Sequence, residues 1–246
     1  MKIKVKKILL FISIILIIPS CATKQSFLKS QVNNDSNILV ISGFSNEFNV
    51  KVIGTTAFTN HMTSFKSIDF DVNKVINGVI NNQYESRNDV VGNQYKSRKY
   101  EIYDGEKNFD FTKGNWYTDI GFSINKYKQD FIKLGQQYNS RYIILIGAER
   151  SSDSIFFTNQ WFKGFGVGRR FLMGQGRSVL FVSVKMALYD TRTNKIVNTV
   201  HTLSHKPTSK LKNGKLHKKS RQEFLILADD FPSLFKSAIN GLLNKL

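Results

Sequence analysis

Short apolar runs bounded by polar residues recur along the chain and predict β-strands. Six such runs span Ile38–Phe44, Asn49–Phe58, Ser97–Tyr103, Arg141–Gly147, Ser178–Tyr189 and Ile196–Ser204. The first two lie close enough in sequence to pair as a hairpin. Arg141–Gly147 is almost continuously apolar, which is typical of a central strand buried on both faces. The turn residues of Asp190–Lys195 predict a hairpin between the last two strands.

Other segments have the spacing of amphipathic helices. They span residues 71–83, 126–138 and 221–246. The first places five aliphatic side chains on one face, and either Asp69 or Asp71 can cap its start. The last carries its apolar residues on one side and should kink or restart at Pro232.

The order of these elements predicts the fold class. It reads β-β-α-β-α-β, a long loop, then β-β-α, which indicates an α/β (α+β) fold with a mixed sheet of about six strands and two or three packed helices. The length fits a single globular domain over residues 38–246. Two segments lack periodicity and are predicted to be loops: a glycine-rich one over about 151–177 and a basic one over about 206–221.

The N-terminal residues have the composition of an export signal. Four lysines precede an apolar stretch over Ile8–Ile18, and the small residue Ser20 precedes Cys21. A basic start, an apolar centre and a small residue before the cleavage point are the order of a secretory signal peptide, here residues 1–20. The apolar stretch is too short for a good membrane-spanning helix.

Ile18-Pro19-Ser20-Cys21 resembles the lipobox of bacterial lipoproteins, with an aliphatic residue three positions before the cysteine and a small residue just before it. The resemblance implies that Cys21 carries a diacylglycerol and a further acyl chain such as palmitate, each buried CH₂ contributing about 0.8 kcal/mol to membrane attachment. Ala22 in place of an aspartate implies the outer membrane, facing the periplasm, if the host has two membranes. An ordinary signal peptide and an uncleaved N-terminal anchor are the alternatives.

Lipidation of Cys21 would also limit the chemistry of the mature chain. Cys21 is the only cysteine, so neither a disulfide nor a cysteine metal site would remain. Residues 21–37 are mostly polar and aperiodic, and they predict a flexible tether between the lipid and the globular domain.

The element order behind the lipobox resembles the periplasmic lipoprotein domains of the curli-secretion (CsgG-like) and penicillin-binding-protein-activator (LpoB-like) group. The resemblance rests on the opening strand at Ile38–Phe44, the helix and strand ending in Tyr142–Gly147, and the hairpin around Ala187–Lys195. It is a resemblance of architecture, and a shared fold does not by itself carry a function.

Basic residues are concentrated in one third of the chain. The whole sequence has 36 basic and 18 acidic residues, and four lysines lie in the signal, so the mature chain has 32 basic residues and a net charge of +14. Residues 154–189 and 191–222 together hold 14 basic residues and no acidic one. Such a field attracts anionic partners, which in a cell envelope are anionic lipid, lipopolysaccharide phosphate, peptidoglycan carboxylates or an acidic protein rather than nucleic acid. The alternative is a solvated basic loop without a partner.

The segment over 151–177 also contains the candidate contact residues. Four aromatic residues precede a pair of arginines: Phe156, Phe157, Trp161 and Phe162 come before Arg169 and Arg170. Aromatic side chains beside arginines are typical of interface anchors, although the rings could instead cap an open end of the core.

The glycines of Gly164–Gly176 suggest a second use for this segment. They could let the backbone approach a phosphate clamped by Arg169 and Arg170. Their spacing fits neither a dinucleotide-binding turn nor a P-loop. The alternative is a lid or a hairpin tip.

The sequence has no arrangement of residues that supports a catalytic or metal-binding site. His201 and His205 could share one face of a strand, but two histidines without a third ligand are weak evidence for zinc, and we predict no metal. Asp229 and Asp230 are adjacent on a predicted helix and therefore point apart. We predict no catalytic residue and no cofactor apart from the lipid on Cys21.

The sequence therefore predicts a lipid-anchored, non-enzymatic envelope lipoprotein that binds a protein or an anionic envelope partner. The predicted contact residues are Trp161, Phe162, Arg169, Arg170, Lys210, Lys212, Lys218 and Lys219. The alternatives are an assembly subunit of an outer-membrane secretion or pore complex, an activator of cell-wall synthesis, and an enzyme acting on envelope glycan.

Overall fold

The computed structural model of the protein describes residues 37–55, 59–66, 68–88, 99–105, 107, 109, 111, 124–172, 175–211 and 215–246. The predicted signal peptide, Cys21 and all but the last residue of the predicted tether lie outside this part of the chain. The strands are β1 (Asn37–Ser42), β2 (Phe48–Ile53), β3 (His61–Phe65), β4 (Lys99–Ile102), β5 (Tyr142–Ala148), β6 (Arg150–Ser152), β7 (Trp161–Leu172), β8 (Gln175–Asp190) and β9 (Lys195–Thr208). The helical segments are α3 (Val72–Asn88), η2 (Asn125–Tyr127), α4 (Lys128–Gln137), η3 (Leu216–Lys218), α5 (Arg221–Phe224), η4 (Leu225–Asp230) and α6 (Phe231–Leu243), where η denotes a 3₁₀ turn.

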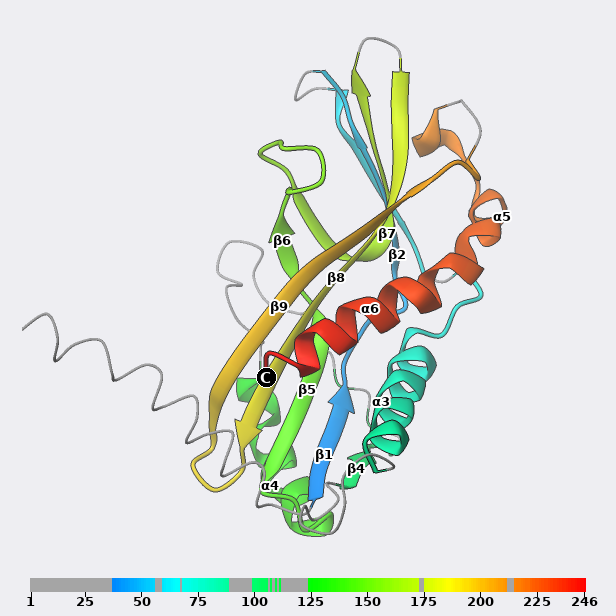
Figure 1. Ribbon diagram of the computed structural model, residues 1–246. Helices are drawn as coiled ribbons and strands as arrows, with labels where there is room; N and C mark the ends of the chain where they lie inside the picture. The colour runs from blue at the N-terminus through cyan, green and yellow to red at the C-terminus, as the bar shows by residue number, and fades with distance from the viewer. Residues whose placement is uncertain are drawn as a thin grey trace, which may run out of the picture.

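The nine strands form one mixed sheet with two arms that share the long hairpin of β8 and β9 (Figure 1). The first half of β8 pairs with β7, with Gly164 opposite Ser183, and the second half pairs with β5, with Ala148 opposite Val184. β9 pairs with the other edge of β8. The upper arm in Figure 1 continues from β7 to β2 and β3, and the lower arm continues from β5 to β1 and β4.

In the lower arm, β1 and β5 are buried on both faces. Ile38 and Val40 of β1 face the core cluster that includes α3 and α6, whereas Leu39 and Ile41 face the cluster that includes Phe131 of α4. β5 lies between β1 and β8, and its residues from Tyr142 to Gly147 are all buried. This confirms the central, doubly buried strand predicted from the apolar run.

The upper arm is covered by a different kind of element on each face. On one face, Phe48 and Phe165 pack against Phe231, which begins α6. We call this the helix face. On the opposite face, the segment 153–160 folds over β7 and β8, where Phe162 packs edge-on against Phe181 with ring centroids 4.7 Å apart. We call this the loop face.

The C-terminal segment follows the predicted amphipathic pattern. Seven apolar side chains predicted to lie on one side are all buried: Phe224, Leu227, Phe231, Leu234, Phe235, Ile239 and Leu242. The predicted restart is also present, because η4 ends at Asp230 and α6 then carries Pro232 in its first turn. Proline is tolerated there, since the first amide groups of a helix lack an intrahelical partner.

The mixed sheet with packed helices confirms the predicted fold class, and all six predicted strands are present within a larger set of nine. The helix predicted over 71–83 is present and extends to Asn88. Asp71 is its cap, because its carboxylate accepts the backbone N–H of Lys74 at 3.1 Å.

The hairpin expected between the first two strands is wrong. β1 pairs in parallel with β4 and β5, whereas β2 pairs with β3 and β7 in the other arm. The connection Gly43–Glu47 therefore carries the chain from one arm of the sheet to the other. Closeness in sequence predicted the wrong partner because the long β8 strand separates the two arms.

The loop expected over 151–177 is also wrong in most of its length. The segment contains part of β6, all of β7 and the start of β8. The strand pattern was hidden because Gly166 and Gly168 occupy the positions on the loop face that alternate with Phe165 and Val167 on the helix face. The basic loop is shorter than predicted, since β9 continues to Thr208 and η3 starts at Leu216.

Candidate functional site: two faces of the upper arm

Adjacent residues of β7 belong to opposite faces of the sheet, as in any strand. Phe165, Val167 and Arg169 lie on the helix face, where Arg169 Nη2 donates to the backbone carbonyl of Leu211 at 3.1 Å. Arg170 lies on the loop face, where Nη1 donates to the carbonyl of Phe156 at 2.5 Å. The structure therefore separates the two arginines that the sequence placed in one contact surface.

The loop face carries a loop that is organised by a single carboxylate. Asp153 is buried, and its Oδ1 accepts the backbone N–H groups of Ile155 at 2.9 Å and Phe156 at 2.7 Å. Its Oδ2 accepts both the N–H and the hydroxyl of Thr158. Charge-assisted hydrogen bonds of this kind are about twice as strong as neutral ones. They fix the segment 153–161, which we call the aromatic loop.

The fixed loop presents two large apolar side chains to solvent. Phe157 is 87% exposed and Trp161 is 48% exposed. Phe157 also has a φ of +55°, a backbone conformation that is rare and strained for a bulky residue. The guanidinium of Arg150 lies 4.8 Å from the centroid of the Trp161 ring, a cation–π contact.

Lys51 of β2 lies beneath the aromatic loop and is only 8% exposed. Its ammonium donates to the carbonyl of Trp161 and lies 5.1 Å from the centroid of the Phe162 ring. Burial lowers the pKa of Lys51 to about 8; Asp153 opposes this effect and Arg150 adds to it. Lys51 thus supports the start of β7 from inside the protein.

The glycines of β7 serve packing rather than the approach of a phosphate. Gly164 has a φ of +65°, which its lack of a side chain permits, and marks the point where β7 passes from β6 to β2. A Cβ on Gly168 would lie 3.0 Å from the Phe162 ring and 3.1 Å from the Phe156 ring. The missing side chain therefore makes room for the aromatic rings of the loop face.

The helix face contains a cavity of about 780 Å³ near the end of β7 and the start of β8. Its lining consists of Arg169, Gly176, Arg177, Ser178, Pro207, Thr208, Ser209 and Leu211. Arg169 is 2% exposed, and its Nε donates to Ser178 Oγ at 2.7 Å. Burial lowers the pKa of this guanidinium from its usual value. We call this the basic cavity.

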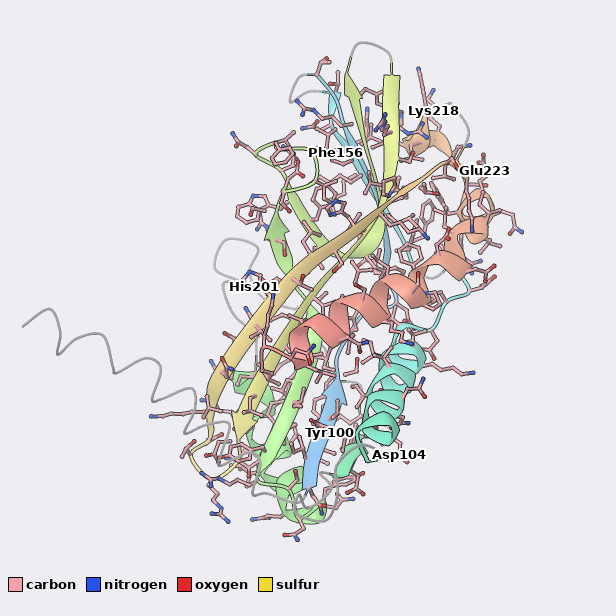
Figure 2. The ribbon with its side chains drawn as sticks, viewed as in Figure 1. Tyr100, Asp104, Phe156, His201, Lys218 and Glu223 are labelled. Atoms are coloured by element: carbon pink, nitrogen blue, oxygen red, sulfur yellow. The ribbon has the colours of Figure 1, made fainter. Side chains whose placement is uncertain are left out.

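The three predicted lysines that are described lie on the helix side, and two of them are held in ion pairs. Lys210 Nζ lies 2.8 Å from Asp230 Oδ2, and Lys219 Nζ lies 2.7 Å from Glu223 Oε1. Lys218 is exposed, and Figure 2 shows it across the upper arm from Phe156. Lys212 and Cys21 lie outside the described residues.

The seven predicted contact residues that the structure describes therefore do not form one surface. The loop face holds Trp161, Phe162 and Arg170, whereas the helix side holds Arg169 and the three described lysines. Phe162 is 1% exposed and packs inside the loop face, so it supports the aromatic loop rather than reaching a partner.

Sequence reasoning missed Asp153, Lys51 and a histidine pair. His61 of β3 stacks on His217 of η3 with ring centroids 4.0 Å apart, and burial, followed by the charges of His61, Lys218 and Lys215, lowers the pKa of His217. The partners are 156 positions apart in sequence, so no spacing could have indicated them. An aspartate followed by small polar residues is a signal for a local turn, but Asp153 lay in a segment taken to be irregular.

The described part of the chain contains no cluster of three or more His, Cys, Asp or Glu side chains able to hold a metal ion. His201 and His205 are both exposed on β9. Among the described helices, none combines the length and hydropathy needed to cross a membrane.

No family model matches the chain, and no curated protein matches it in sequence. Similar solved structures include the PelC dodecamer from Paraburkholderia phytofirmans, with 9% identity over 86% of this chain and 88% of that one and a TM-score of 0.33. A Xanthomonas campestris protein of the DUF330 family has 11% identity over 85% and 80% of the two chains and a TM-score of 0.36. The lipoprotein GNA1162 from Neisseria meningitidis has 14% identity over 80% and 96% and a TM-score of 0.24. At these values the similarities assign neither a family nor a function.

Proposed function

We propose that the protein is a lipid-anchored, non-enzymatic component of the bacterial cell envelope that binds a protein partner through the aromatic loop. Cys21 carries the lipid, residues 21–37 provide reach, and Phe157 and Trp161 make the central contacts. The observation that carries the proposal is the exposure of Phe157, at 87%, on a loop that Asp153 holds in one conformation.

A fixed loop is well suited to bind a protein. An aromatic side chain buried at an interface contributes a large contact area, and a loop that is already ordered loses little conformational entropy on binding. Three further apolar residues lie beneath the loop, so the exposed rings stand on a packed support: Ile53, Phe162 and Phe181. Arg150 beside Trp161 completes the aromatic and arginine composition typical of interface hot spots.

The test begins with cross-linking in cells and mass spectrometry, which identify the partner. Affinity is then measured for Phe157→Ser and Trp161→Ser, each in the mature chain with Cys21→Ser. A hot-spot residue contributes 2 kcal/mol or more, so we expect each substitution to weaken binding by about thirtyfold or more.

Ile226→Ser is the matched control. Ile226 is an apolar side chain with 50% exposure, similar to that of Trp161, but it lies in η4 on the helix side. We expect this variant to bind like the parent. Equal loss in all three variants, or no loss in the two aromatic-loop variants, would contradict the proposal.

A membrane surface is the other surface that could receive exposed aromatic side chains. The unlipidated chain is therefore also tested for flotation with vesicles of phosphatidylethanolamine and phosphatidylglycerol. Flotation that is lost in Phe157→Ser would show that the loop contacts lipid and would contradict the protein-binding proposal.

The lipid anchor has its own test. We expect metabolic acyl labelling of the parent protein and none of Cys21→Ser, since the lipobox resemblance makes Cys21 the acylated residue. Label that persists on the variant would contradict the anchor without bearing on the aromatic loop.

A further inference from the structure

The basic cavity lies on the helix face, away from the aromatic loop, and the proposed function does not use it. Its inner wall is a row of side chains on three neighbouring strands. Arg169 of β7 is paired with Ser178 of β8, and Ser178 is paired in turn with Thr208 of β9. Directly paired residues point to the same face of a sheet, so the guanidinium and both hydroxyl groups face the cavity together.

The guanidinium of Arg169 is held in place on several sides. Ser178 Oγ and the carbonyl oxygen of Leu211, both neutral acceptors, receive hydrogen bonds from Nε and Nη2. A Cβ on Gly176 would lie 3.0 Å from Cγ of Arg169 and 3.1 Å from Cδ, so the glycine makes room for the arginine stem. A positioned guanidinium with five N–H donors is the group best suited to bind a carboxylate or a phosphate.

Each of the two hydroxyl groups of the row already accepts a hydrogen bond, and this bond orients it. Ser178 Oγ accepts Arg169 Nε–H, and Thr208 Oγ1 accepts the backbone N–H of Lys210 at 3.3 Å. A hydroxyl that accepts a hydrogen bond still has its own O–H to donate. The row can therefore offer hydroxyl donors beside the guanidinium to the oxygens of one anion.

The surroundings favour a negative ligand. None of the described residues that line the cavity is acidic. Burial disfavours the charged form of Arg169, and a bound anion would offset this cost. The cavity volume of about 780 Å³ exceeds that of a single phosphate or carboxylate and is in the range that holds a small organic molecule.

We infer that the basic cavity binds the phosphate or carboxylate group of an envelope molecule, with Arg169, Ser178 and Thr208 as the groups that contact the oxyanion. Leu211 lies where the uncharged part of the ligand would pack. The site does not depend on the aromatic loop, so either proposal can fail without the other.

The test is a titration followed by nuclear magnetic resonance, using the full mature chain with Cys21→Ser. Inorganic phosphate and sodium acetate are added separately at constant ionic strength, and the backbone amide shifts of Gly176, Ser178 and Leu211 are followed. We expect saturable shifts in the millimolar range with at least one of the two anions. Saturation with phosphate alone indicates a phosphate group, and saturation with acetate indicates a carboxylate group.

Variants then locate the site. We expect Ser178→Ala and Thr208→Val to weaken binding about tenfold, because hydrogen bonds to a charged ligand are among the stronger ones. Arg169→Gln should abolish saturation. If that variant does not fold, the binding of Ser178→Ala and Thr208→Val tests the location of the site, because both variants keep Arg169.

Arg170→Gln is the matched control, since Arg170 is the next residue of β7 and lies on the loop face. Its binding should stay within twofold of the parent. The inference is overturned if neither anion gives saturable shifts, or if Arg170→Gln weakens binding as much as Ser178→Ala does.

Discussion

The two faces of the upper arm are built from the same strands but differ in what covers them. The helix face is covered, except at the basic cavity, by helical segments whose phenylalanines pack against Phe48 and Phe165. The loop face is covered by a short loop that depends on one carboxylate and one buried lysine, Asp153 and Lys51. Neighbouring residues of one strand thus face a packed core on one side and a loop with exposed aromatic side chains on the other.

The largest expected effect is a difference in stability between truncating a buried ring and truncating an exposed ring of the loop face. Phe162→Ala should lower the free energy of unfolding by about 3–5 kcal/mol, as is typical when a buried phenylalanine is truncated. Phe157→Ala should change it by less than about 0.5 kcal/mol, because an exposed side chain loses little packing. Urea denaturation measures both. Comparable losses would show that Phe157 is part of the core and not of a contact surface.

Removal of the carboxylate should loosen the loop face while leaving the helix face intact. Asp153→Ala leaves several backbone N–H groups without their acceptor, and we expect a loss of about 1–3 kcal/mol. In hydrogen exchange, the amides of Ile155, Phe156 and Thr158 should exchange faster while those of α6 keep their protection. Uniform acceleration across the protein would contradict the separation of the two faces.

The buried lysine predicts a pH dependence that belongs to the loop face. The pKa of Lys51 is lowered by burial to about 8 in the folded protein, against 10.5 for an unburied lysine. Between these values the unfolded chain binds more protons than the folded chain, so stability gains a contribution that increases as pH rises from 8 to 10.5. Below pH 8 the folded protein holds the buried charge and the gain is absent.

Lys51→Met tests this dependence, because methionine is of similar length and uncharged. The variant should lack the extra rise in stability between pH 8 and 10. The measurement is urea denaturation of both proteins at several pH values from 7 to 10. Parallel curves would show that Lys51 does not carry a lowered pKa.

The smallest effect is expected from the surface ion pairs of the helix side. Lys210 Nζ lies 2.8 Å from Asp230, and both groups have access to solvent. Lys210→Ala should therefore change the free energy of unfolding by less than about 1 kcal/mol, and the difference should shrink in 1 M salt. A larger, salt-independent loss would place Lys210 among the structural residues.

Local patterns were sufficient to predict those parts of the fold in which each element buries one continuous apolar face. The seven apolar positions of the C-terminal segment and the restart at Pro232 follow directly from helical spacing. The buried run of β5 likewise follows from its composition. β7 could not be recognised in this way, because its glycines remove the alternating side chains from the loop face.

The candidate sites were predictable in composition but not in arrangement. The sequence indicated the aromatic and basic residues of the upper arm, including Trp161, Arg169 and Arg170. It could not indicate that Arg169 and Arg170 face opposite sides, because that conclusion requires knowing that they lie in a strand. It also could not bring Ser178 beside Thr208, because this pairing depends on the register of a long hairpin with a bulge.

Site-specific photo-cross-linking in cells tests the central claim most directly, with the photoreactive residue at position 157 on the loop face or at position 218 on the opposite side of the upper arm. Both positions are exposed, so the probe is accessible in each. We predict a discrete protein adduct from position 157 and none from position 218. An adduct from position 218 alone, or the same adduct from both positions, would contradict the assignment of partner binding to the aromatic loop.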